Sequence, residues 1–233
     1  NGSADSTVEL VKKYGGKTIS TPLDDYDARK NLALKQVATP WVFYLDADER
    51  ITPLLRQEIQ SLLKTSSKSL ASAYQIPRRN IYLGREMKFG GWGGEYVIRL
   101  FQTSQLKTWQ GILHEQPQIE GETAKLTHEI VHLSHRNLET MVEKTILFTQ
   151  KEAQLRLDAN HPPVIWWRLF RVMFSEFWLR FIKLLAWRDG TEGVIDGIFQ
   201  VFNTFIIYAR LWETQNPEIV SSVKSKPLNA QLS

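Results

Sequence analysis

What this chain of 233 residues lacks narrows its possible functions. It contains no cysteine, which excludes disulfides, thiolate metal sites and a cysteine nucleophile. Neither the dinucleotide-binding glycine pattern nor a P-loop occurs, so we expect no NAD or ATP site of those kinds. The polar start, Asn1 to Asp5, has no apolar core of the kind found in signal peptides.

The charge balance is only mildly basic. The formal net charge is +4 and the sequence pI is about 9.2. This suits anionic substrates or lipid headgroups but falls short of a nucleic-acid-binding signature, so no nucleic acid is expected as a partner. With 42% hydrophobic and 23% charged residues, the composition is that of a globular protein.

The first 70 residues alternate between helix and strand signals. A capping box at Ser6 to Glu9 predicts a short helix, and the apolar run Trp41 to Leu45 suits a strand buried on both faces. Alternation of this kind predicts an α/β domain with a largely parallel sheet. The predicted helices are 7–14, 28–37 and one beginning after Thr52-Pro53, and the strands are 17–20 and 41–45.

The later part changes from short strands to long helices. Strands are predicted near 74–77, 97–101 and 126–133, and helices at 138–157, 164–187 and 191–213. We therefore expect a catalytic domain over residues 1–137, a helical amphipathic region over 138–215 and a flexible polar tail over 216–233.

An acidic cluster follows the apolar strand. Ligands of open α/β sheets bind at the carboxyl ends of strands, where Asp46, Asp48 and Glu49 fall. Hard oxygen ligands of this kind suit Mg²⁺ or Mn²⁺ shared with a substrate phosphate. The plainer alternative is a solvated acidic turn that caps the next helix.

Three motifs together resemble a known family. They are Asn1-Gly-Ser-Ala-Asp-Ser-Thr7, Ala28-Arg-Lys-Asn31 and Trp41-Val-Phe-Tyr-Leu-Asp-Ala-Asp-Glu49. They resemble the family 2 glycosyltransferases of the GT-A fold, and most closely the small bacterial enzymes of lipopolysaccharide core synthesis. The resemblance implies a GT-A-type nucleotide-sugar domain that is N-terminally incomplete here, with the first two strands of the nucleotide fold preceding Asn1.

The resemblance also implies a donor site. Asp46 and Asp48 match the D-x-D pair, with Asp48 as the direct metal ligand and Asp46 nearer the ribose or the metal. Arg29 and Asn31 would lie beside the nucleotide. Asp5 would sit near the nucleotide turn, although helix capping explains it equally well.

The resemblance gives roles to two further segments. His114-Glu115 matches the position of the catalytic base, so Glu115 would take the proton of the acceptor hydroxyl with His114 in support. His132 resembles the late histidine that helps to bind the metal-diphosphate. A structural histidine at a strand end is the alternative.

A glycine-rich loop lies between the predicted strands. Its backbone is free to approach a ligand, and similar loops of the fold cover the donor and acceptor sugars. Trp92 would offer a flat face to a sugar ring, or else pack in the core of a plain hairpin bend. Arg99 would meet a phosphate or pair with Glu95. The loop residues assigned to this site are Gly91, Trp92, Gly93, Glu95 and Arg99.

His128-Glu-Ile-Val-His132 matches the zinc-peptidase pattern HExxH, which requires a helix. The segment alternates and contains β-branched residues, which favours a strand. Two strand residues four positions apart are about 13 Å from each other and cannot share a zinc ion. A peptidase is therefore not expected.

The segment 164–187 separates into a basic half and an aromatic half when drawn as a helix. Its charges exclude a bilayer-spanning segment, and a basic face opposite Trp and Phe is typical of a helix lying in the membrane interface. The uncharged run 197–209 of the next helix is also too short to span. The alternative is that these helices pack on one another, on the catalytic domain or in a dimer.

Together these features predict a metal-dependent inverting glycosyltransferase. The donor would be a nucleotide sugar, UDP-linked by resemblance, and the acceptor a lipid-linked saccharide. The enzyme would be cytoplasmic and peripheral on the inner face of the cell membrane. The alternative from another class is a membrane-associated binding module that kept the fold and lost catalysis.

Overall fold

The computed structural model describes residues 5–23, 25–65, 70–111, 113 and 115–218. The chain forms two compact units. The first combines Asn1–Asp46, Pro53–Ile76 and Tyr96–His128, and the second combines Ala47–Thr52, Pro77–Glu95 and Glu129–Ser233. The predicted boundaries at 137 and 215 coincide with the start of one helix at Leu138 and the end of another at Gln215. The functional meaning of that division stays a prediction.

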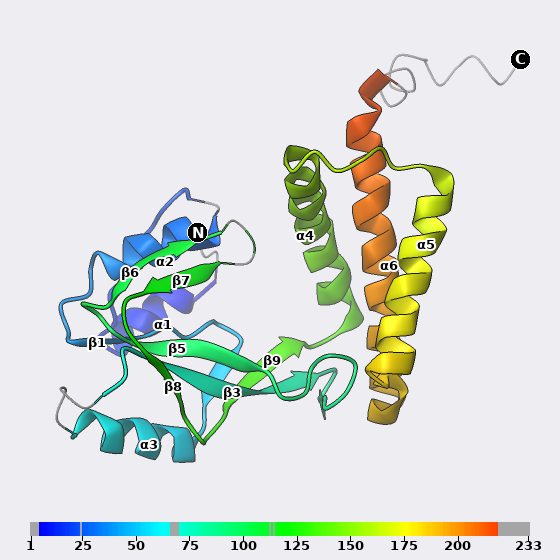
Figure 1. The fold of residues 1–233 in the computed structure, drawn as a ribbon. Helices are drawn as coiled ribbons and strands as arrows, with labels where there is room; N and C mark the ends of the chain where they lie inside the picture. Colours follow the sequence, from blue (N-terminus) through cyan, green and yellow to red (C-terminus); the bar gives the residue numbers. More distant parts are fainter. Residues whose placement is uncertain (1–4, 24, 66–69, 112, 114, 219–233) are drawn as a thin grey trace, which may run out of the picture. The chain divides into compact units, whose positions relative to one another are not determined.

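The first unit joins three helices to a sheet and a hairpin (Figure 1). Strand β1 pairs antiparallel with β5, β5 lies next to β3, and β8 pairs parallel with the first residues of β3. Buried Phe101 and Trp109 form its core with Ala73 and Leu106. The elements are α1 (Thr7–Lys13), α2 (Tyr26–Leu34), α3 (Pro53–Leu63), β1 (Trp41–Phe43), β3 (Ala73–Tyr82), β5 (Tyr96–Gln102), β8 (Thr123–Lys125) and the hairpin β6 (Leu106–Gln110) with β7 (Gln116–Ile119).

The second unit takes over β3 from Pro77 onward. There β9 (Ile130–His135) pairs parallel with β3, and β2 (Glu49–Ile51) pairs antiparallel with β9. A short β4 (Arg85–Glu86) folds back on the end of β3. This sheet places the residue before β2 close to the middle of β9, which determines the site described below.

The same unit contains a helical bundle. Its helices are α4 (Leu138–Asp158), α5 (Trp166–Phe177) and α6 (Gly190–Gln215), which run side by side (Figure 1). A π-helical segment, Trp178–Lys183, and a 3-10 turn, Ala186–Asp189, connect the last two. Asn137 caps α4 by accepting a hydrogen bond from the Thr140 amide. Buried Thr145 of α4 donates to Asn203 of α6 and so joins the two helices.

The α/β class is confirmed, but the predicted sheet was wrong in detail. The sheet is mixed rather than largely parallel, because β1 pairs antiparallel with β5. Accordingly β1 is only half buried, not buried on both faces. Residues 17–20 form no strand. The capping box is absent too: the Ser6 side chain makes no cap bond, and Asp5 accepts from the Thr7 amide instead.

The rejection of a zinc peptidase is supported. His128 lies in a bend and His132 lies in strand β9, which begins at Ile130 rather than at 126. HExxH therefore does not present two histidines on one helix face.

Candidate functional site

Asp48 and His132 meet in the second unit. Asp48 directly precedes β2, whose Glu49 is paired in register with His132 of β9. The His132 Nε2 atom lies 3.5 Å from Asp48 Oδ2, and the Lys144 ammonium lies 3.8 Å from the same oxygen. His132 is the chief reason that the pKa of the Asp48 carboxyl lies below its usual value, and Lys144 contributes in the same direction.

Asn80 of β3 orients His132. Its side chain is 1% exposed, and its Nδ2 donates to the Trp92 carbonyl at 2.9 Å and to Glu95 Oε2 at 3.1 Å. Those two acceptors fix the amide orientation, so Oδ1 faces His132 Nδ1 at 2.8 Å and must accept its proton. In its neutral form His132 therefore carries its proton on Nδ1 and directs the Nε2 lone pair toward Asp48, whereas in its protonated form Nε2 donates to Asp48, which is the contact that lowers the Asp48 pKa.

Two acceptor atoms that face one another repel unless a proton or a cation lies between them. Two neighbouring ligands of an octahedral Mg²⁺ are about 3 Å apart, since each lies about 2.1 Å from the ion. The 3.5 Å separation of Asp48 and His132 is close to that value, and the Asn80 bond is the outer-shell support that metal-bound histidines usually have. The pair therefore fits one side of a divalent cation site.

The protein would not enclose such an ion by itself. Within the described ranges, no three His, Asp or Glu side chains gather closely enough to hold a metal. Magnesium and manganese are commonly held by one or two protein ligands together with water and substrate phosphate. The donor set is thus suited to an ion that is shared with a diphosphate.

A partly buried ionic network lies beside this pair. Arg78 of β3 contacts Glu95 through two bonds, at 2.6 and 3.1 Å, and lies 3.9 Å from the fully buried carboxylate of Glu49. Removing Arg78 would be costly, because the Glu49 carboxylate would stay buried without its charged partner. The network holds β2, β3 and the end of the glycine loop together.

Asp46 lies in the first unit, where it is held by Arg99. The Arg99 Nη2 atom of β5 donates to Asp46 Oδ2 at 2.5 Å, and Arg99 is 7% exposed whereas the Asp46 side chain is 45% exposed. The suggested pairing of Arg99 with Glu95 was wrong, since Glu95 is bound by Arg78 instead. Asp46 is therefore oriented by Arg99 while nearly half of its side chain is exposed.

Glu115, the expected base, precedes β7 in the first unit. Its Oε1 lies 2.6 Å from the Lys30 ammonium of α2, and the Glu115 side chain is 18% exposed. The same ammonium lies 4.3 Å from the centre of the Trp109 ring. Glu115 is thus a largely buried, ion-paired carboxylate. His114, its expected support, lies outside the described residues.

The other donor-site candidates make local contacts. Asn31 binds β6 through both ends of its amide, accepting from the Trp109 amide at 2.8 Å and donating to the Trp109 carbonyl at 2.9 Å. The Arg29 Nε atom donates to the Leu23 carbonyl. Asp5 accepts from the Thr7 amide at the start of α1, and hydrogen bonds from Thr7 hold the pKa of the Asp5 carboxyl below the usual value. In the ligand-free protein Asn31 joins α2 to the hairpin. The roles of Asn31, Arg29 and Asp5 in binding a nucleotide stay predictions.

The glycine loop, residues 88–94, packs onto the helical bundle within the second unit. Its Trp92 ring lies 5.8 Å from the Tyr82 ring, and the indole Nε1 donates to Asp196 Oδ2 of α6 at 2.6 Å. A side chain at Gly93 would approach the Lys88 carbonyl to 2.1 Å, and Gly91 has a φ of +97°. Glycine is therefore required for the shape of this loop. Trp92 is partly buried, as in the alternative that placed it in the core.

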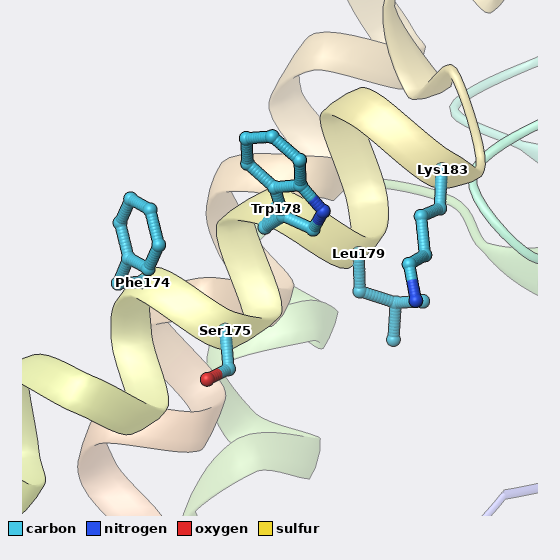
Figure 2. Close-up of a pocket in the computed structure, with 5 residues that line it drawn as sticks. All are labelled: Phe174, Ser175, Trp178, Leu179 and Lys183. Atoms are coloured by element: carbon cyan, nitrogen blue, oxygen red, sulfur yellow. The ribbon is translucent and has the colours of Figure 1, made fainter.

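The bundle exposes a band of large apolar side chains along α5 and its π-helical continuation. Figure 2 shows one hollow on this surface, which is lined by Phe174, Ser175, Trp178, Leu179 and Lys183. Trp166, Phe170 and Phe174 are each about two-thirds exposed or more, at 73%, 68% and 65%. We call this surface the aromatic face. Its exposed residues are Trp166, Trp167, Phe170, Phe174, Phe177, Trp178, Leu179 and Ile182.

One described helix, Ala186–Gln215, is long and apolar enough to cross a membrane by length and composition. The sequence-based prediction that this helix is too short to span a membrane considered only the uncharged run 197–209. The length and composition of the whole helix do not support that prediction. Core helices of soluble proteins pass the same test, but they are mostly buried, whereas 22% of the apolar window of this helix is buried. Here the helix carries the buried Asp196 and packs against α4 and α5, so we describe it as a bundle helix.

Sequence reasoning missed the residues that support the site. Asn80 and Arg78 lie in a strand whose pattern gives no hint of a ligand, and Asp196 lies in an apolar helix. An uncompensated Asp in such a helix is itself a signal, because a buried carboxylate requires partners. Lys144 gives no comparable signal, since lysine is common on helix surfaces.

No protein-family model matches the chain. An uncharacterized glycosyltransferase of Rickettsia typhi is 25% identical over 91% of this chain and 76% of its own length. The lipopolysaccharide core biosynthesis glycosyltransferase LpsC of Rhizobium meliloti is 24% identical over 91% of this chain and 80% of its own. A further uncharacterized glycosyltransferase, of Rickettsia conorii, is 24% identical over 96% of this chain. The resemblance to bacterial glycosyltransferases is thereby confirmed, since the chain is similar to them over more than nine tenths of its length.

Proposed function

We propose that this chain is a metal-assisted, inverting glycosyltransferase that uses a nucleotide-sugar donor and a lipid-linked or saccharide acceptor. The observation that carries the proposal is the Asp48–His132 pair, oriented by Asn80, in a homologue of glycosyltransferases. Two ligand atoms on one side of a cation position suit a shared metal-diphosphate. A solvated acidic turn would need neither a buried amide nor a fixed histidine tautomer.

Asp48 and His132 would hold Mg²⁺ or Mn²⁺, and Asp46 would bind the ribose hydroxyls of the donor. Bound there, the cation would supply neutralisation of the negative charge on the diphosphate leaving group. Arg99 keeps the Asp46 carboxylate in one orientation, so Asp46 can accept hydrogen bonds without first being reordered. The nucleotide is UDP by resemblance, and Arg29 and Asn31 would lie beside it.

Glu115 would act as the base. The acceptor oxygen attacks C1 of the sugar, the bond from C1 to the phosphate oxygen breaks, and Glu115 takes the acceptor proton. Attack opposite the leaving group inverts the anomeric configuration. In the ligand-free protein Glu115 is bound to Lys30, so the acceptor hydroxyl must replace or share that contact. Lys30 would hold the carboxylate in one orientation until the acceptor arrives.

The aromatic face would bring the enzyme to its lipid-linked acceptor. Exposed Trp and Phe side chains, with arginines above the Trp167 ring, have the composition of a helix that lies among lipid headgroups. LpsC is named for lipopolysaccharide core synthesis, whose acceptor is lipid-linked, and this supports an acceptor of that class. The location we propose is the cytoplasmic face of the cell membrane, with peripheral attachment.

The test is a transfer assay with full-length protein. A panel of nucleotide sugars is supplied with Mn²⁺ and a membrane-lipid extract as the acceptor source, and nucleoside diphosphate release and labelled lipid are measured. We expect transfer with one donor, an inverted anomer in the product by NMR, and a loss on the order of 1000-fold in Glu115→Gln. Asp158→Asn, an exposed carboxylate at the end of α4, serves as the control.

Equal turnover by Glu115→Gln would contradict the assignment of the base. A retained anomeric configuration would contradict the inverting mechanism. The absence of transfer with every donor by folded protein would favour the membrane-associated binding module instead.

A further inference from the structure

The conformation of the glycine loop is set by the helices of the second unit. Asp196 of α6 is completely buried, and its carboxylate accepts from Trp92 Nε1 at 2.6 Å and from Gln200 Nε2 at 3.1 Å. Burial raises the pKa of Asp196, while hydrogen bonds from Trp92 and Gln200 act in the opposite direction. Burying a carboxylate in an apolar helix costs free energy unless the hydrogen bonds that it accepts compensate for the lost hydration.

Two further helical residues bind the loop backbone. Asp189, 4% exposed, accepts from the Lys88 and Phe89 amides at 2.9 and 2.7 Å. Arg180 of the π-helical segment donates to the Gly90 carbonyl at 2.6 Å. The Gly90 amide donates to the Leu184 carbonyl. Four residues of the loop are therefore hydrogen-bonded to the helical region: Lys88, Phe89, Gly90 and Trp92.

Small residues allow this close approach. A Cβ atom at Gly197 would lie 2.8 Å from the Phe181 ring, and one at Gly193 would lie 2.0 Å from the Ala186 carbonyl. Both glycines lie in α6, on either side of Asp196. Their lack of side chains lets the turn before α6 and the π-helical segment pack against the helix.

The other side of the loop reaches the candidate metal pair. The Trp92 carbonyl accepts from Asn80, and the same Asn80 side chain holds His132 at 2.8 Å. Trp92 thus has its indole bound to α6 and its carbonyl bound to the residue that orients His132. A continuous series of hydrogen bonds runs from Asp196 through Trp92 and Asn80 to His132.

We propose that Asp196 is a positioning residue of the transfer reaction, which fixes the glycine loop beside the Asp48–His132 pair through Trp92. The C-terminal helices are then part of the substrate site as well as a membrane-binding region. The inference rests on the proposed function. It assigns to Asp196, Asp189 and Arg180 a role in placing the donor rather than in contacting it.

The test compares variants that break the bond with variants that preserve it. Asp196→Leu removes the acceptor, Trp92→Phe removes the donor and keeps a smaller aromatic ring, and Asp196→Asn keeps one acceptor oxygen. Thr145→Val is the matched control, because it removes a buried bond between α4 and α6 without touching the loop. Hydrogen exchange of the amides of residues 88–94 is measured in ligand-free protein, and kcat and KM for the donor are measured with Mn²⁺.

We expect loop amides to exchange at least tenfold faster in Asp196→Leu and Trp92→Phe than in the control. We also expect kcat to fall on the order of 100-fold with a smaller change in KM, since displacement of a bound substrate by about 1 Å has such an effect. Asp196→Asn should restore most of the slow exchange of the loop amides and most of kcat. If Asp196→Leu does not fold, Trp92→Phe and Asp196→Asn decide the question.

Loop exchange and kcat equal to those of Thr145→Val would overturn the proposal, because Asp196 would then serve stability alone. Failure of the transferase proposal itself is distinguishable. In that case wild-type protein would transfer no sugar. Faster hydrogen exchange of the loop amides in the variants would then show that Asp196 only stabilises the loop conformation.

Discussion

Asn80 shows how one buried side chain determines the chemistry of its neighbours. Its amide has a single workable orientation, because one end faces a carbonyl and a carboxylate. That orientation selects the tautomer of His132 and makes Nε2 available toward Asp48. A buried side chain thereby orients the histidine that we propose as a cation ligand.

Replacing Asn80 by leucine should weaken metal binding more than it disrupts the fold. We expect Mn²⁺ affinity in the presence of nucleoside diphosphate to fall about 10- to 100-fold, the usual cost of losing the outer-shell partner of a histidine. The free energy of unfolding should fall by about 1–3 kcal/mol, because Glu95 and His132 lose buried partners. Titration of Mn²⁺ followed by electron paramagnetic resonance, with urea unfolding alongside, measures both. Unchanged affinity would show that His132 does not depend on Asn80.

His135 should make folding stability depend on pH. Burial is the main reason that its pKa falls to about 4, with the charges of Lys144 and His132 acting in the same direction. The unfolded chain binds this proton near pH 6.5 and the folded chain only near 4, so stability should fall as the pH is lowered between those values. Its ring packs edge-on against Tyr82, so His135→Phe keeps the contact and removes the titration. Urea unfolding from pH 7 to 4 should show a shallower loss of stability in this variant. An identical pH profile would contradict the account.

Among the elements, the glycine loop and the aromatic face differ in how much of each is bound by the rest of the protein. The loop is bound on both sides by hydrogen bonds, whereas the aromatic face leaves large rings exposed. Exposed apolar area of this extent marks an interaction surface rather than a solvated helix. The two elements are joined by the π-helical segment, which carries Arg180 toward the loop and Trp178 on the exposed face.

Two glycines of the loop should respond differently to alanine. At Gly93 the added Cβ would approach the Lys88 carbonyl to 2.1 Å, so the backbone must move. At Gly94 the space is open but φ is +72°, which costs an L-residue about 1–2 kcal/mol. Gly93→Ala should therefore lower the free energy of unfolding more than Gly94→Ala, as measured by urea titration. The reverse order would show that the loop adjusts easily near Lys88.

The aromatic face should bind anionic membranes. We expect the double variant Phe170→Ser and Phe174→Ser to lose at least tenfold in partitioning to phosphatidylglycerol vesicles, because each buried Phe contributes about 1.5–3 kcal/mol. Tyr14→Ser, which alters a residue 82% exposed in the first unit, is the control. Vesicle sedimentation measures the effect. Unchanged partitioning, together with loss of a dimer on gel filtration, would assign this face to self-association.

For the whole molecule, the sequence predicted the class of fold better than it predicted which elements contact one another. Helices with long apolar periods, such as α4 and α6, were predicted within a few residues. The antiparallel partner of β1 was not predicted, because pairing depends on residues far along the chain. The same holds for the site. Asp48 and His132 stand out as chemical types, whereas Asn80 and Asp196 become significant only through partners that no local pattern reveals.

The central claim is that Asp48 and His132 hold a divalent cation together with a nucleoside diphosphate. Calorimetric titration of UDP and other nucleoside diphosphates, with and without Mn²⁺, tests it on full-length protein, on Asp48→Asn and on the control Asp158→Asn. The account predicts binding of one nucleotide only with Mn²⁺, weakened at least tenfold in Asp48→Asn and unchanged in the control. Metal-independent binding of equal strength in all three proteins, or no binding by folded protein, would contradict it.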